Sequence, residues 1–84
     1  MKNYVPLCLA LIDALLVLET SAPTEIDSDI AVRGMENMSS SLLMLDDDDQ
    51  LELRRALNNI AQESADLVYR KFVESVPDMM GLAS

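Results

Sequence analysis

The sequence predicts an all-α fold: a small antiparallel helical bundle of three main helices with a short C-terminal tail, in one domain over residues 1–84. The first reason is composition, because half of the residues are hydrophobic, only 4% are aromatic, and only two are glycine. The abundant Leu, Ala, Met, Glu and Arg favour helices, whereas strands prefer β-branched and aromatic residues. The second reason is that apolar residues recur at helical spacing and rarely alternate with polar ones.

The first expected helix covers residues 4–20 and is almost wholly apolar, with Asp13 in its middle. The apolar run of residues 5–18 is shorter than the about 20 residues that a membrane span needs. A signal peptide is the more serious alternative, because Lys2 precedes this run. An acid within the run and Pro23 just after the expected cleavage point oppose it. We therefore expect a soluble helix that makes no membrane contact.

This helix carries more apolar surface than one small chain can cover. A small or polar stripe follows one side and comprises Lys2, Pro6, Ala10, Asp13, Val17 and Thr20. The wider remaining arc carries Leu7, Cys8, Leu11, Ile12, Leu15, Leu16 and Leu18. A helix that is apolar nearly all round is normally buried, and a chain of this length buries only about 60–65% of its unfolded surface. We therefore expect this helix to lie in an interface with a partner or, as a possible homodimer, with a second copy.

The second expected helix covers residues 25–45. Thr24-Glu25-Ile26-Asp27 is a start signal for it, and Asp27 and Ser28 are later candidates for its N-terminal cap. Apolar residues recur along it at helical spacing and form a seam of Ala31, Met35, Met38, Leu42 and Leu45. Ile26 and Ile30 are expected to widen this seam. Asp29 and Arg33 are four residues apart, which predicts an ion pair on the outer face.

The third expected helix covers residues 47–76, with Asp46 as its cap and an end just before Pro77. Its apolar stripe consists of Leu53, Leu57, Ile60, Ala61, Ala65, Val68, Phe72 and Val76. Because this helix would be long, we expect a kink near Asn58-Asn59 or Ser64. The tail cannot continue the helix, but it can fold back as an apolar plug through Met79, Met80 and Leu82.

The charge of the chain limits its partners. The net charge is −9, from 15 acidic and 6 basic residues, so the surface repels nucleic acid and favours a basic protein partner. Cys8 is the sole cysteine, which excludes an internal disulfide and a multi-cysteine zinc site. We expect a reducing, cytoplasmic location and no cofactor or bound metal.

Four consecutive aspartates, Asp46, Asp47, Asp48 and Asp49, are the most polar point of the chain. An EF-hand loop from Asp46 would need Gly and Glu where the sequence has Leu51 and Leu57, so we do not expect a calcium site. One aspartate is enough to cap a helix, and Asp48 is four residues from Glu52, which is a repulsive spacing. The surplus of charge points to a partner-binding surface. Its candidate residues are Asp46, Asp47, Asp48, Asp49 and Glu52, with Asp27 and Asp29 as weaker members.

Nothing in the sequence predicts catalysis. There is no histidine, and the single cysteine lies on an apolar helix, so the usual pairs of nucleophile and base are absent. The serines at 39–41 are polar positions on the second helix, and Arg54-Arg55 balance nearby acids. We therefore predict a non-enzymatic protein with no catalytic residue.

Two stretches carry a resemblance to a known group of proteins: SDIAVRGMENMSSSLLML and LRRALNNIAQESA, within residues 28–65. Together with the apolar opening helix, they resemble the small acidic helical immunity proteins of bacterial toxin–immunity pairs. The resemblance is greatest to those of type VI secretion effectors that degrade NAD(P). The resemblance implies that the protein inhibits a cognate toxin by occluding the active site of that toxin. The active site of the toxin is then expected to be basic or to bind phosphate. The aspartate run departs from the pattern, so the resemblance assigns no contact residue.

Two hypotheses from different classes follow. The first is an inhibitory binding protein of the immunity type. The second is a homo-oligomeric structural or regulatory adaptor, whose acidity serves only solubility.

Overall fold

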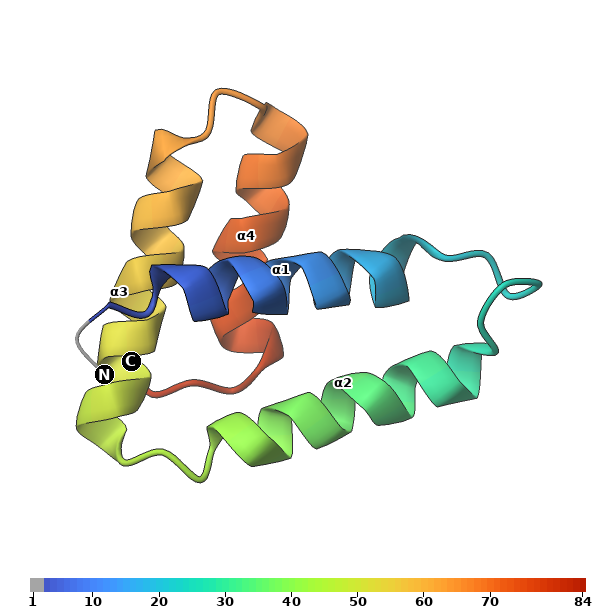
Figure 1. Cartoon of the computed structure of the whole chain (residues 1–84), viewed down its shortest axis with the longest axis horizontal. Coiled ribbons are helices and arrows are strands. Elements are labelled where there is room, and N and C mark those ends of the chain that lie inside the picture. Colours follow the sequence, from blue (N-terminus) through green and yellow to red (C-terminus); the bar gives the residue numbers. More distant parts are fainter. Residues whose placement is uncertain (1–2) are drawn as a thin grey trace.

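A computed structural model describes residues 3–84 and contains four helices: α1 (Val5–Thr20), α2 (Ser28–Leu42), α3 (Asp47–Glu63) and α4 (Leu67–Met79) (Figure 1). No strand occurs among these residues, so the all-α prediction is confirmed. The prediction of three main helices is wrong, because the expected third helix is two helices joined by a turn. Lys2, which was expected on the polar stripe of the first helix, lies outside the described residues.

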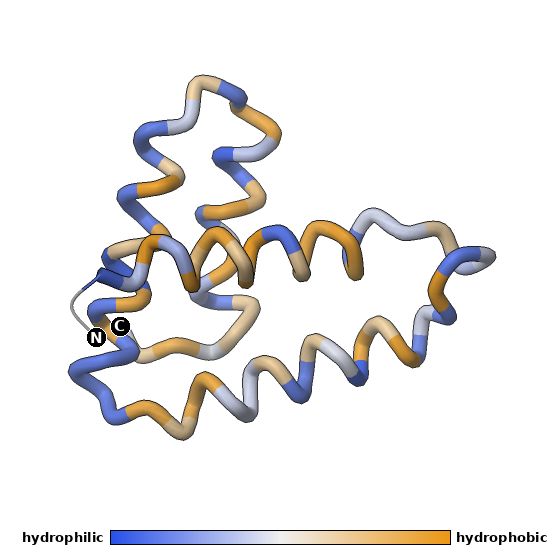
Figure 2. Tube along the Cα trace, viewed as in Figure 1, coloured by the Kyte–Doolittle hydropathy of each residue, from blue (hydrophilic) through white to orange (hydrophobic). Residues whose placement is uncertain are grey.

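Helix α1 forms as the sequence predicts and buries one face. Pro6 lies in its first turn, where a missing N–H breaks no intrahelical bond, and the Asn3 side chain accepts a hydrogen bond from the Val5 N–H at 3.0 Å. Cys8, Ile12 and Leu15 are completely buried, and Asp13 is exposed on the opposite side. Figure 2 shows hydrophobic residues along much of α1. Leu7, Leu9 and Val17 of this helix are exposed to solvent.

Helix α2 begins at Ser28, three residues later than expected, because Asp27 is its cap, and it ends at Leu42, three residues before the expected end. The Asp27 carboxylate accepts hydrogen bonds from the N–H groups of Asp29 and Ile30 at 2.9 and 3.4 Å. The predicted seam is confirmed: one member is buried and the others are half-buried, and it comprises Ala31, Met35, Met38, Leu42 and Leu45. Ile30 was expected to widen this seam, but it is 58% exposed, so that expectation is wrong.

The chain reverses direction at residues 64–66, where the sequence predicted at most a kink. Helix α3 ends at Glu63, and the Asp66 carboxylate caps α4 by accepting hydrogen bonds from the N–H groups of Val68 and Tyr69 at 2.9 and 3.2 Å. The reversal lets both halves of the expected helix bury an apolar face against the same core. Ala65 and Val68 were expected on that face and are exposed instead.

Helix α4 continues through Pro77 to Met79, so the expected end before Pro77 is wrong. The helix closes two residues later at Gly81, which has a φ of 71°. The N–H of Gly81 bonds to the carbonyl of Asp78 at 3.1 Å, and that of Leu82 bonds to the carbonyl of Pro77 at 3.0 Å. This is the Schellman arrangement, in which glycine relieves the strain of a positive φ. The tail then folds back and buries Met80 and Leu82, which confirms the predicted apolar plug for these two residues. Met79, its third expected member, is the last residue of α4 and is half-buried.

The hydrophobic core lies where α1 meets the pair formed by α3 and α4. Helix α4 packs beside α3, and α1 contacts both α3 and α2 (Figure 1). The fully buried cluster comprises Cys8, Ile12, Leu15, Leu53, Leu57, Ala61, Val73, Val76, Met80 and Leu82. Helix α2 contributes no residue to this cluster and covers it from one side through half-buried side chains. An antiparallel arrangement of the bundle as a whole remains a prediction.

Candidate functional site

The four aspartates and Glu52 form the acidic corner, which lies where α2 turns into α3. Asp46 is the cap of α3: its carboxylate accepts a hydrogen bond from the Asp49 N–H at 2.8 Å. Asp47 and Asp48 are exposed, and no ion pair or side-chain hydrogen bond to them occurs within residues 3–84. The hydrophilic segment at this junction is visible in Figure 2. Asp46 alone caps the helix through a hydrogen bond, and the other three aspartates lie in its first turn.

Asp49 is half-buried because Tyr4 packs against it. The Tyr4 hydroxyl donates a hydrogen bond to the Asp49 carboxylate at 3.2 Å, across 45 residues of sequence. Desolvation raises the pKa of Tyr4, and the negative charges of Asp49, Asp46 and Glu52 raise it further. Tyr4 was not among the predicted site residues, because no local pattern indicates that the start of α1 meets the start of α3.

The two adjacent arginines have different roles. Arg55 forms an exposed ion pair with Glu52, in agreement with the expectation that it balances an acid. Arg54 points instead to the C-terminal tail, where its guanidinium donates to the carbonyls of Leu82 and Ala83 at 2.9 and 2.8 Å. Arg54 therefore stabilises the tail, which sequence reasoning did not predict.

Asp27 and Asp29 lie at the other end of α2 from the acidic corner. With a rise of 1.5 Å per residue, the helix separates them from its last turn by about 20 Å. The Asp27 carboxylate is occupied as a cap, and the predicted ion pair between Asp29 and Arg33 does not occur among the described residues. The structure therefore does not bring these two residues together with the acidic corner.

An apolar groove of about 290 Å³ opens between α1 and the end of α2, next to the acidic corner. We call it the leucine groove, and it is lined by Tyr4, Leu7, Leu11, Ser41, Leu42, Leu45 and Leu53. A second hollow continues it along α2, since Leu11, Ser41 and Leu42 also line that hollow together with Asn37 and Met38. The α2–α3 turn beside it exposes two further apolar side chains, Leu43 and Met44.

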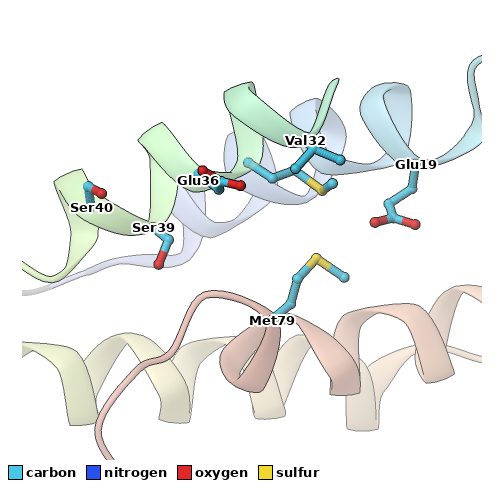
Figure 3. A pocket seen from close by; sticks show the side chains of 7 residues that line it. Glu19, Val32, Glu36, Ser39, Ser40 and Met79 are labelled. Atoms are coloured by element: carbon cyan, nitrogen blue, oxygen red, sulfur yellow. The ribbon is translucent and has the colours of Figure 1, made fainter. Parts of the chain in front are cut away.

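A larger and more polar crevice of about 470 Å³ lies on another side of α2 (Figure 3). Glu36 and Ser39 of α2 face Met79 of α4 across it, and Glu19 enters from the end of α1. The Ser39 hydroxyl donates a hydrogen bond to the Met80 carbonyl at 2.7 Å. No hydrogen bond joins this hydroxyl to Glu19 or Glu36 among the described residues, so the crevice contains no bonded pair of nucleophile and base.

The remaining reactive groups lie apart from these surfaces. Cys8 is completely buried, and desolvation raises the pKa of its thiol to about 11, so it carries no thiolate at neutral pH. Residues 3–84 contain no cluster of three or more His, Cys, Asp or Glu side chains placed to hold a metal ion. Among the four described helices, none has the length and hydropathy needed to cross a bilayer.

Comparisons with known protein families, curated proteins and solved structures gave no match for this chain.

Proposed function

We propose that this chain is a non-enzymatic binding protein of the immunity type, which inhibits a cognate bacterial toxin by occluding its active site. The observation that carries the proposal is the acidic corner, where Asp47 and Asp48 add charge beyond what the α3 cap uses. Like charges stacked at a helix start repel one another, so their presence favours a role outside the fold. The resemblance over residues 28–65 supports the same class of protein.

The proposed mechanism is electrostatic. A toxin that acts on a dinucleotide needs a pocket that attracts phosphate, and a row of carboxylates fits the same positive field. The acidic corner then blocks substrate without any chemistry of its own, in keeping with a chain that has no histidine and a buried thiol. Complementary charge mainly accelerates association, so the association rate constant should fall as salt rises. The protonated, buried Cys8 is consistent with a reducing compartment, and we propose the cytoplasm.

The test compares two variants that change the net charge equally. Replacing Asp47, Asp48 and Asp49 with Asn raises the net charge from −9 to −6, since three acids are removed. Asp46 remains as the cap, and an asparagine oxygen at position 49 still accepts the Tyr4 hydrogen bond. The matched control replaces three exposed acids on other faces with their amides, in the variant Asp13→Asn, Glu63→Gln, Glu74→Gln.

The toxin is first identified by its capture with this protein. One readout is the survival of cells that express this toxin, and the other is the affinity between the two purified proteins. We expect the corner variant to lose protection and to bind at least about tenfold more weakly, which corresponds to 1.4 kcal/mol. The control should do neither. If the corner variant protects as well as the parent at physiological salt, the aspartates only start a helix and the proposed mechanism fails.

Exposed apolar residues on α1 favour the second candidate function, a homo-oligomeric adaptor. Leu7, Leu9 and Val17 are each more than 40% exposed, so α1 keeps apolar surface for a second copy. Sedimentation velocity at rising salt separates the two functions. A dimer that forms only when salt screens the charge of −9 would support the adaptor.

A further inference from the structure

The leucine groove and the acidic corner form one continuous feature. Tyr4 lines the groove, and its hydroxyl is bonded to Asp49 of the corner. Leu45 also lines the groove and precedes Asp46 directly in the chain. An apolar trough therefore ends in a cluster of carboxylates.

The lining of the groove indicates what chemistry can occupy it. Apart from the Ser41 hydroxyl and the Tyr4 phenol, the lining side chains are aliphatic, and none carries a positive charge. Leu7 is 51% exposed, so the groove wall is accessible from solvent. An occupant needs apolar side chains toward the groove and positive charge toward the adjoining acidic corner, where Asp47 and Asp48 have no partner among the described residues.

We propose that the leucine groove seats one face of a basic amphipathic helix supplied by a partner protein. Side chains at positions i, i+3 or i+4, and i+7 of that helix form a single apolar stripe, which matches an elongated trough between two helices. Its lysines or arginines lie beside the stripe and reach the acidic corner. The groove thereby fixes the orientation of the partner, and the corner fixes which charge the partner carries.

Charge complementarity selects this occupant over a second copy of the chain. Each copy carries a net charge of −9, and a symmetric dimer through this groove places two acidic corners near one interface. Like charges across an interface oppose association. The inference rests on the proposed binding function, but it identifies different residues and a stated class of partner.

The experiment uses the full chain and three fluorescein-labelled peptides, each about 18 residues, or five turns of helix. The first contains Leu in one stripe and Lys elsewhere. The second has the same composition in scrambled order, so it keeps the charge and lacks the stripe. The third keeps the stripe and carries Glu in place of Lys. Fluorescence anisotropy gives each affinity, and amide chemical shifts locate the bound peptide.

Two variants of the protein locate the binding within the groove. Leu7→Gln removes apolar surface from the groove wall, and Val17→Gln makes the same kind of change on the outer face of α1. A docked helix can bury about half of the Leu7 side chain, so Leu7→Gln should weaken binding about three- to tenfold. Val17→Gln should leave the affinity unchanged. Circular dichroism of both variants confirms that the fold is retained.

The expected result is tight binding of the striped basic peptide alone, with shifts at Leu11 and Leu42. Equal binding of the scrambled peptide overturns the groove inference and leaves the electrostatic role of the acidic corner intact. Equal binding of the acidic striped peptide overturns the assignment of a basic occupant. A dimer that Leu7→Gln dissociates, with no peptide binding, assigns the groove to a second copy. Failure of the proposed function appears separately, in the protection assay with the asparagine variant.

Discussion

Replacing Arg54 with Met should destabilise the protein far more than the same change at its neighbour Arg55. The Arg54 side chain is only 20% exposed and donates hydrogen bonds to the carbonyls of Leu82 and Ala83 and to the carboxylate of Asp78. The Arg55 side chain is 68% exposed and forms an ion pair with Glu52 alone. Methionine keeps most of the aliphatic volume in both cases, so the comparison isolates the guanidinium.

The expected magnitude follows from these contacts. A hydrogen bond from a charged donor contributes about 1.5–3 kcal/mol, and the two carbonyls that Arg54 holds are partly shielded from solvent. Water can donate hydrogen bonds to the carbonyls that lose the guanidinium, which offsets part of the lost free energy. We therefore expect Arg54→Met to lower the free energy of unfolding by about 2–4 kcal/mol. An exposed ion pair contributes about 0–1 kcal/mol, which sets the loss for Arg55→Met. Domains of this size have total stabilities of roughly 4–13 kcal/mol, so the larger loss is easily resolved.

Urea unfolding followed by circular dichroism measures both losses, with the parent protein as reference. Hydrogen exchange gives an independent check, because the Ala83 N–H is bonded to the Gln50 side chain at 3.0 Å and should exchange faster once Arg54 is removed. Losses that agree within about 0.5 kcal/mol would refute the reasoning, since the tail would then hold its place without the guanidinium.

Two further predictions concern the core. Because burial raises the pKa of Cys8 from 9.0 to about 11, the folded state keeps a proton that the unfolded chain loses. The titration of Cys8 should therefore lower the free energy of unfolding by roughly 2–3 kcal/mol as pH rises through that window. Urea titrations at both ends of the window should show a smaller loss for Cys8→Ala, in which only other groups such as Tyr4 contribute. Val68→Ser should change stability by less than about 0.5 kcal/mol because Val68 is exposed, whereas Val73→Ser in the same helix should cost about 2–4 kcal/mol. Equal losses for the two valines would contradict the exposure of Val68 and the burial of Val73.

The caps of α2 and α3 were predictable from sequence, but the start of α4 and the break before it were not. Asp27 and Asp46 act as caps because a short carboxylate reaches backbone N–H groups locally, whatever the rest of the chain does. The apolar spacing continues without interruption from Ala61 through Val68, so periodicity gives no sign of the turn. The turn instead results from packing, because Val73 and Ala61 both reach the one core only if the chain reverses.

The candidate site likewise has a part that depends on local sequence and a part that depends on contacts between distant segments. The aspartate run is a local feature and can be read from the sequence. The bond between Tyr4 and Asp49 and the leucine groove depend on segments far apart in the chain, so no local pattern predicts them. Pro77 is the converse case: a helix-ending residue lies inside α4 because the chain closes the helix later, at Gly81.

The first turns of α3 hold both ends of the described chain. Tyr4 is bonded to Asp49 across 45 residues, and Ala83 is bonded to Gln50 across 33. Each bond closes a long loop, and the entropy of closure must be overcome before the contact contributes. Such non-local closures slow folding relative to helical proteins with mainly local contacts. We therefore expect the hairpin of α3 and α4 to form early, and the rate of folding to be limited by the arrival of both ends at a single site.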